Sequence, residues 1–185
     1  DALLSFSRHA TSKIENEHDL FRIRTLGFRG EALASIASVS KVVLDTSDGT
    51  SGTHLEMEGG RLTERRAGAL RQGTYVRINQ LFFNTPARLK YMKTLQTELG
   101  HTIDLMNRFA LSYPGISFRL VHDGKQLLQT AGSGEIRRVL ADIYGVAIAK
   151  KMIAFEGESA DYQIEGFASL PEITRANKNY ISLFV

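Results

Sequence analysis

Apolar residues follow first a helical and then an alternating spacing in the first third of the chain. Residues 29–39 carry apolar side chains at the i, i+3 and i+4 positions of one helix face, which predicts a helix there. Val42 and Leu44, and then Leu55 and Met57, alternate with polar neighbours, as is typical of half-buried strands. This part of the chain is therefore predicted to pack a helix against a sheet.

Turn residues and further apolar runs complete the predicted secondary structure. Asp48-Gly49 and Gly59-Gly60 are typical of hairpin turns between neighbouring strands. The longest helix is predicted over 95–112, because Pro114-Gly115 ends its apolar stripe. The other predicted helices are 1–9, 17–24, 86–93 and 135–143, and the other predicted strands are 61–67, 74–79, 116–122, 126–130, 151–155 and 162–168. Helices on one side of a mainly antiparallel sheet give an α+β fold.

Composition narrows the class of protein only a little. With 43% hydrophobic and 23% charged residues, the 185-residue chain has enough apolar content for a real core. The sequence lacks cysteine, which excludes disulfides and any cysteine-based metal site or nucleophile, and fits a reducing cytoplasm. No apolar stretch is long enough to span a membrane. A net charge of +3 permits contact with DNA without arguing for it.

An arginine flanked by glycines stands directly before the first strong helical pattern, in the run Gly27-Phe-Arg-Gly30. Glycine lets the backbone adopt positive φ or approach a ligand closely. The start of a helix presents unpaired N–H groups and the positive end of its dipole, an arrangement that suits a phosphate. By itself, the pattern is better explained by an ordinary helix cap.

Three further segments stand around this run in a specific order. They are Arg8–Ile14 before it, and Gly73–Val76 and Leu81–Lys90 after it. Together the four segments resemble the N-terminal ATPase region of the MutL family of DNA mismatch repair proteins. That family belongs to the GHKL, or Bergerat-fold, superfamily, which also contains gyrase B subunits, certain heat-shock chaperones and sensor histidine kinases. The resemblance implies a sandwich of a mixed, mainly antiparallel sheet with helices on one face.

The resemblance also implies a domain organisation. Residues 1–131 would form a partial ATPase domain, and 135–185 would begin a second, α/β transducer domain after the polar turn at Ala131–Gly134. The family's catalytic glutamate, its magnesium-binding asparagine and its adenine-reading Asp-x-Gly-x-Gly loop have no counterpart in this sequence. We therefore expect no catalytic residue and no metal ligand within the chain, and no ATP hydrolysis by residues 1–185 alone.

Ten residues match the family segments that line the nucleotide. In the glycine segment, backbone N–H groups would wrap the phosphates of ATP; upstream hydroxyls and a lysine would face phosphate or ribose; a threonine would lie under adenine. The predicted ATP-binding residues are Thr11, Ser12, Lys13, Gly27, Phe28, Arg29, Gly30, Glu31, Ala32 and Thr74.

Several of these residues have simpler roles that the sequence leaves open. Thr11 and Ser12 are also suited to capping the following helix. Arg29 either contacts phosphate or only braces the segment, and Glu31 is better suited to stabilising a helix dipole than to acting as a base. Thr74 is also an ordinary strand residue.

Two predictions concern the segment after the predicted sheet. Asn84–Arg88 is predicted to open a helix with an Asn or Thr cap ahead of proline, and to support the nucleotide region without contacting the nucleotide. Tyr91 and Phe109 are predicted to be core residues.

The activity implied by the resemblance is slow hydrolysis of ATP, with Mg²⁺ as cofactor, coupled to a change of shape. ATP would order the glycine segment, and the ordered segment would favour dimerisation of two copies. The implied partners are a second copy of the protein, the mismatch-recognition protein of the repair system and, weakly, DNA; no membrane partner is expected. The alternative is a non-catalytic module that binds DNA or protein.

Overall fold

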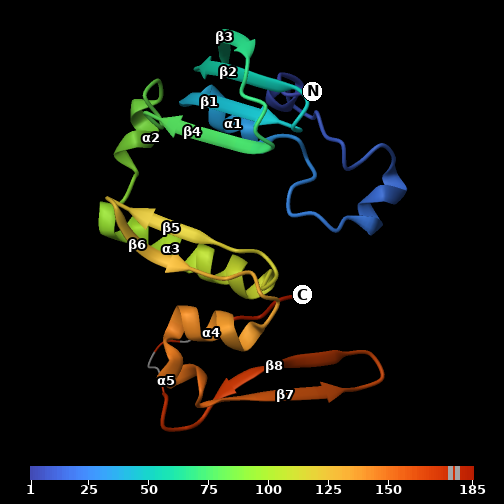
Figure 1. The fold of residues 1–185 in the computed structure, drawn as a ribbon, viewed down its shortest axis with the longest axis vertical. Coiled ribbons are helices and arrows are strands. Elements are labelled where there is room, and N and C mark those ends of the chain that lie inside the picture. Colours follow the sequence, from blue (N-terminus) through green and yellow to red (C-terminus); the bar gives the residue numbers. More distant parts are fainter. Residues whose placement is uncertain (175–176, 178–179) are drawn as a thin grey trace. The chain divides into compact units, whose positions relative to one another are not determined.

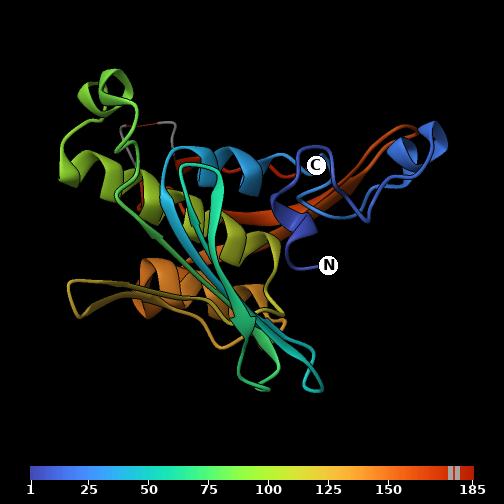
Figure 2. The same ribbon diagram turned by 90° about the horizontal axis from the view of Figure 1, so that it is seen from above.

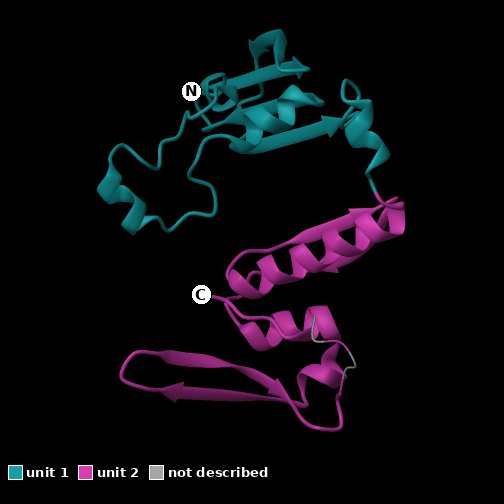
Figure 3. Ribbon diagram, turned by 180° about the vertical axis from the view of Figure 1, so that it is seen from behind, with its two compact units in different colours: residues 1–92 teal, residues 93–185 magenta. Residues whose placement is uncertain are grey.

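The computed structural model describes residues 1–174, 177 and 180–185. The chain divides into two compact units, residues 1–92 and 93–185, which Figure 3 colours separately. The first unit holds all ten predicted ATP-binding residues. This division groups residues by their contacts, so the predicted functional boundary at Ala131–Gly134 stays a prediction.

The first unit is built on a four-stranded antiparallel sheet in the order β3-β2-β1-β4 (Figure 1). The strands are β1 (Lys41–Ser47), β2 (Gly52–Glu58), β3 (Arg61–Ala67) and β4 (Gly73–Asn79). Both predicted turns connect these strands, and Gly49, Gly59 and Gly60 there have positive φ, which only glycine adopts at little cost. The prediction of antiparallel strands at these positions is confirmed.

Helix α1 (Ala32–Ser38) packs on one face of the sheet, because the small side chains of its inner face allow close approach. Ala37 forms a buried cluster with Val42 of β1 and Met57 of β2. Leu55 is fully buried on the same face. The side chains of β3 and β4 are exposed along both strands, so the core of this unit lies under β1 and β2.

The part of the segment before α1 that contains the second 3-10 helix extends away from the sheet (Figure 2). The whole segment contains two 3-10 helices, η1 (Leu4–Phe6) and η2 (Glu17–Arg22), where longer helices were predicted. Neither has a fully buried residue, although the partly buried Phe6 of η1 packs against the cluster of Ala37, Val42 and Met57. A helix without a buried face gains little stability from packing, which fits the short length of both. Asn16 caps η2 by accepting a hydrogen bond from the His18 N–H, and the Asp19 carboxylate accepts one from the Asn16 N–H.

The second unit packs helices against two antiparallel hairpins (Figure 1). Ala110 of α3, Leu128 of β6 and Val139 of α4 form its buried cluster. Helix α3 has the bounds that its apolar stripe predicts. The elements are α3 (Leu95–Ser112), β5 (Arg119–His122), β6 (Lys125–Gln129), α4 (Ile136–Tyr144), α5 (Val146–Ala149), β7 (Met152–Glu158) and β8 (Gln163–Ser169).

Other features also differ from the predictions. Helix α1 begins at Ala32 and not at 29, because Gly30 has a left-handed backbone with φ of 64°. Helix α2 (Pro86–Lys90) ends earlier than predicted. Tyr91 was predicted to be a core residue, but it is 86% exposed, so that prediction was wrong.

Candidate functional site

The glycine segment before α1 packs directly on the upstream segment of the chain. A Cβ atom added to Gly30 would lie 2.3 Å from the carbonyl oxygen of Ala10 and 2.9 Å from its nitrogen. The backbones at these two positions are thus in close contact, and no side chain fits between them. Gly30 is therefore required both for its positive φ and for this close approach.

A side-chain pair joins the same two segments. The imidazole Nδ1 of His9 lies 3.2 Å from the carboxylate of Glu31, the residue before the first turn of α1. Both side chains are largely exposed, so this pair contributes little to stability. The pair shows that residues 8–13 lie beside the glycine segment.

The structure does not support the alternative role of Thr11 and Ser12 as caps of the following helix. The hydroxyl of Thr11 accepts a hydrogen bond from the backbone N–H of Lys13 at 3.1 Å, which closes a local turn. The following helix is capped by Asn16 instead. Ser12 and Lys13 are exposed, so their polar groups face solvent next to the glycine segment.

The glycine segment carries a run of backbone donors that bind nothing within the described residues. The N–H groups of residues 27–31 donate no hydrogen bond to the described part of the chain, and those of the first turn of α1 have no partner within the helix. Successive free N–H groups ahead of a helix form a concave donor surface that suits a polyphosphate.

Arg29 lies on the outside of this segment. Its guanidinium carbon is 5.4 Å from the centre of the Phe28 ring, a cation–π contact within the segment. This position corresponds to the bracing role, and the exposed guanidinium also remains accessible to an anion.

The opposite end of α1 is tied to two neighbouring loops. The N–H of Gly60 donates to the carbonyl oxygen of Ala37 at 2.8 Å, and the N–H of Phe82 donates to that of Val39 at 2.7 Å. The side-chain amide of Asn84 donates to the carbonyl oxygen of Ser38 at 2.9 Å. The last carbonyl groups of the helix are therefore satisfied by residues far along the chain.

The loop that supplies two of these donors has an unusual backbone. Gln80 and Phe82 have φ values of 50° and 66°, which are costly for residues with a side chain. Of the two predicted cap residues, Thr85 occupies the N-cap position of α2 directly before Pro86, although its side chain makes no cap hydrogen bond. The predicted supporting role of this segment fits the bond from Asn84 to the end of α1.

Thr74 lies at the start of β4, away from the contacts described above. Its hydroxyl forms a hydrogen bond of 2.9 Å with that of Thr46, the residue opposite it on β1. None of the side-chain hydrogen bonds that Thr74 makes within the described residues joins it to the glycine segment. Sequence reasoning missed Thr46, Ala10 and Phe82, because none of them has a side chain that signals a special role.

The sheet face away from α1 carries a buried histidine between two carboxylates. His54 of β2 lies 2.7 Å from Asp45, its neighbour on β1, and 3.3 Å from Glu56. Its side chain is only 6% exposed. The hydrogen bond to Asp45 raises the pKa of His54 above its ordinary value, and Glu56 adds to this, while burial and Arg66 act against it. The histidine is a structural residue of the sheet.

Within the described residues, no helix combines the length and apolar character needed to cross a membrane. Over the same residues, no three His, Cys, Asp or Glu side chains gather closely enough to hold a metal ion.

Comparison with known proteins gives consistent matches along the whole chain. The DNA mismatch repair protein MutL of Geobacillus thermodenitrificans is 62% identical over 100% of this chain, and that of Listeria innocua is 58% identical over the same share. The chain spans only 29% and 31% of the lengths of these relatives.

A sequence profile of the family described as "DNA mismatch repair protein, C-terminal domain" matches residues 140–185. Among solved structures, the Aquifex aeolicus MutL ATPase domain complexed with ADP superposes with a TM-score of 0.69 at 25% identity. That match covers 90% of this chain and 68% of the solved one. Sequence and fold agree, and the chain belongs to the MutL family of DNA mismatch repair proteins.

Proposed function

We propose that this chain forms part of an ATP-binding switch, in which residues 27–32 wrap the phosphates of the nucleotide and residues 11–13 line the same pocket. The observation that carries the proposal is the packing of Gly30 on Ala10, which holds a run of free backbone donors beside the exposed side chains of Ser12 and Lys13. The ADP bound by the Aquifex aeolicus MutL ATPase domain supports a nucleotide as the ligand.

In the proposal, backbone donors, cationic side chains and a threonine contact different parts of the nucleotide. Backbone N–H groups of Gly27, Phe28 and Gly30 would donate hydrogen bonds to phosphate oxygens, and the two glycines place no bulky side chain in the way. Lys13 and Arg29 would supply positive charge from two sides. Thr74 is proposed to lie under the adenine, at the sheet end marked by its hydrogen bond to Thr46.

The described residues offer no group of carboxylates or histidines that fits a magnesium ion, so the proposal takes no step through the metal. When bound, Mg²⁺ would neutralise phosphate charge. Glu31, the carboxylate nearest the glycine segment, is engaged by His9 and is not proposed as a base. The residues of this chain therefore bind and order the nucleotide in the proposal, and do not activate water.

The proposed partners follow from exposed apolar side chains that lie between residues 13 and 27, just before the glycine segment. Leu20 is 51% exposed, Phe21 90% and Leu26 68%, which is much apolar surface for one short stretch. Ordering by nucleotide would present this surface to a second copy of the protein, so nucleotide binding and dimerisation would be coupled. In a repair system, the nucleotide-driven change would alter how the protein binds the mismatch-recognition protein and DNA.

The test is ATP affinity in a full-length protein that contains this chain. Arg29→Glu places a carboxylate beside the polyphosphate and should weaken ATP binding by about tenfold or more, as measured by calorimetric titration. Arg65→Glu, on exposed β3, makes the same change of charge outside the site and should leave the affinity within about twofold. Equal affinity for both variants would remove Arg29 from the site.

A further inference from the structure

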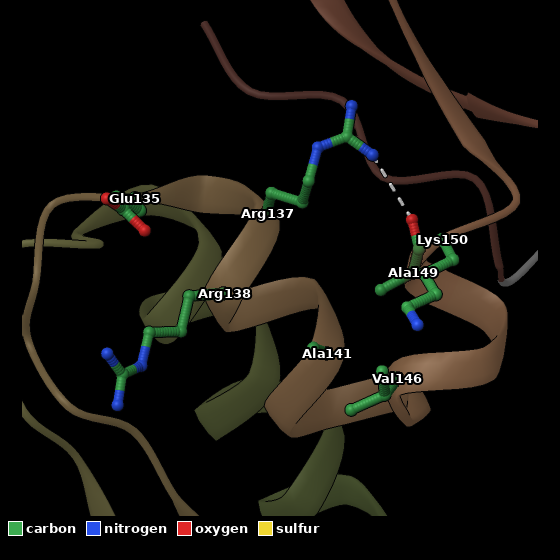
Figure 4. A pocket seen from close by; sticks show the side chains of 7 residues that line it. All are labelled: Glu135, Arg137, Arg138, Ala141, Val146, Ala149 and Lys150. Carbon is green, nitrogen blue, oxygen red and sulfur yellow. Dashed lines mark hydrogen bonds between the residues drawn. The ribbon is translucent and has the colours of Figure 1, made fainter.

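A concave site of about 520 Å³ opens on the second unit, where α4 meets α5 (Figure 4). Gly145 makes this junction, because its φ of 89° ends α4 and turns the chain directly into α5. Ala141 of α4 and Val146 and Ala149 of α5 form an apolar floor. Val146, the first residue of α5, is an aliphatic residue that is 61% exposed.

The rim of the site is basic. Arg138 and Lys150 border the floor from α4 and from the end of α5, and neither has a partner among the described residues. Figure 4 shows the Arg138 side chain directed away from Arg137 and Lys150, so the two free cations flank the floor from different sides. Glu135 is the one acidic residue in the lining. The charge of the rim is therefore positive.

A third cation holds the wall of the site in place. The guanidinium of Arg137 donates hydrogen bonds to the carbonyl oxygens of Ala149 at 3.3 Å and of Met152 at 2.9 Å. It also lies 5.1 Å from the centre of the Phe167 ring. These contacts fix α5 against α4 and the β7–β8 hairpin. The concavity is thus built by a braced side chain and does not depend on a loose loop.

An apolar floor between free cations selects among possible occupants. A nucleic acid backbone would satisfy the cations, but its hydrated phosphates would gain nothing from Val146 and Ala141. A peptide with an aliphatic side chain between carboxylates satisfies both features, since the apolar side chain loses water on the floor while each carboxylate meets one cation.

We propose that this site docks an acidic segment of a partner protein, with one aliphatic side chain against Val146 and carboxylates at Arg138 and Lys150. The proposal is independent of nucleotide binding, because every residue it uses lies in the second unit. It identifies a surface through which a protein partner is recognised by charge and by one anchor side chain.

The test uses residues 1–185 and a short fluorescent peptide with a central leucine between aspartates and glutamates. We expect saturable binding by fluorescence anisotropy that weakens as salt is raised. Arg138→Glu combined with Lys150→Glu should weaken it by about tenfold or more, since both carboxylate contacts become repulsive. Lys125→Glu is the matched control, as an exposed lysine of the same unit outside the site, and should change affinity by less than about twofold.

A second pair of measurements tests the floor. A peptide with serine in place of leucine should bind about tenfold more weakly to the unaltered protein. Val146→Ser should reduce this preference while both peptides still respond to salt. The proposal is overturned if the acidic peptide does not saturate, if the double variant binds like the control, or if leucine and serine peptides bind equally. It is also overturned if a DNA duplex displaces the peptide and binds more tightly, which would make the rim a phosphate-binding surface.

Discussion

At its C-terminal end, α1 is tied to two loops by three hydrogen bonds, from Gly60, Phe82 and Asn84. At its N-terminal end, the glycine segment meets the upstream chain through the Gly30–Ala10 contact and the exposed His9–Glu31 pair. Further upstream, Phe6 packs against the cluster of Ala37, Val42 and Met57. One end of the helix therefore belongs to the core of the sheet, while the other is left open to solvent. A helix fixed at one end offers a rigid platform on which an open segment can respond to a ligand.

The largest expected effect lies at the fixed end. Met57→Ala removes a side chain that packs with Ala37 and Val42, and should lower the free energy of unfolding of the first unit by about 2–4 kcal/mol. Hydrogen exchange of the β1 and β2 amides measures this loss. Leu62→Ala, on exposed β3 at the position opposite Met57, is the control and should cost less than about 1 kcal/mol. Equal losses would show that α1 does not cover a core.

A smaller effect is expected at the open end. Gly30→Ala forces a left-handed alanine, at about 1–2 kcal/mol, and a collision with Ala10. The segment can relieve this strain by detaching, so hydrogen exchange should increase in residues 8–14 while the sheet amides stay protected. Gly27→Ala is the matched control, because nothing lies within 4 Å of the added Cβ there. Loss of protection across the whole sheet would contradict the claim that the segment before α1 can detach without unfolding the sheet.

Asn84→Ala should have an effect of about 1 kcal/mol on the first unit, because it removes one hydrogen bond to the carbonyl oxygen of Ser38. Because the bond is exposed, a water molecule can bind the Ser38 carbonyl oxygen in the variant, which keeps the loss of stability small. We expect faster hydrogen exchange at the C-terminal turn of α1 and unchanged exchange in residues 8–14, which would show that the two ends of the helix respond independently. Gln129→Ala, whose amide bond at 3.4 Å lies in the second unit, is the control. Exchange that changes first at residues 8–14 would show that the two ends are coupled.

The smallest effect concerns the opposite face of the sheet. The pKa of His54 is raised in the folded state, so the protonated imidazole stabilises the fold. This contribution is fully present below the ordinary pKa of histidine and is lost as pH rises through the raised pKa of the folded state. Urea unfolding followed against pH should show the loss, and His54→Gln should flatten the profile. His101→Gln, an exposed histidine on α3, should leave the slope unchanged.

Helices and strands in which buried side chains recur at a regular spacing could be predicted from local sequence patterns. Strands β1 and β2 follow from alternating apolar residues, and their turns follow from glycines that tolerate positive φ. Helix α3 follows from its stripe and from the proline that ends it. The motifs around Gly30 placed the chain in its family, and relatives at 58–62% identity confirm that placement.

Only the tertiary structure decided how the ends of α1 are satisfied. Asn84 reaches Ser38 across 46 residues of sequence, and Phe82 N–H reaches Val39 at a comparable separation. Such bonds depend on which backbone groups lie near one another after folding, and no local periodicity encodes them. Helix α5 has four residues, too few to show a period, and the site beside it depends on Arg137 folding back onto Ala149. Local sequence patterns are therefore enough to predict most of the helices and strands and the family, whereas the set of backbone groups left free to bind a ligand depends on how the elements pack.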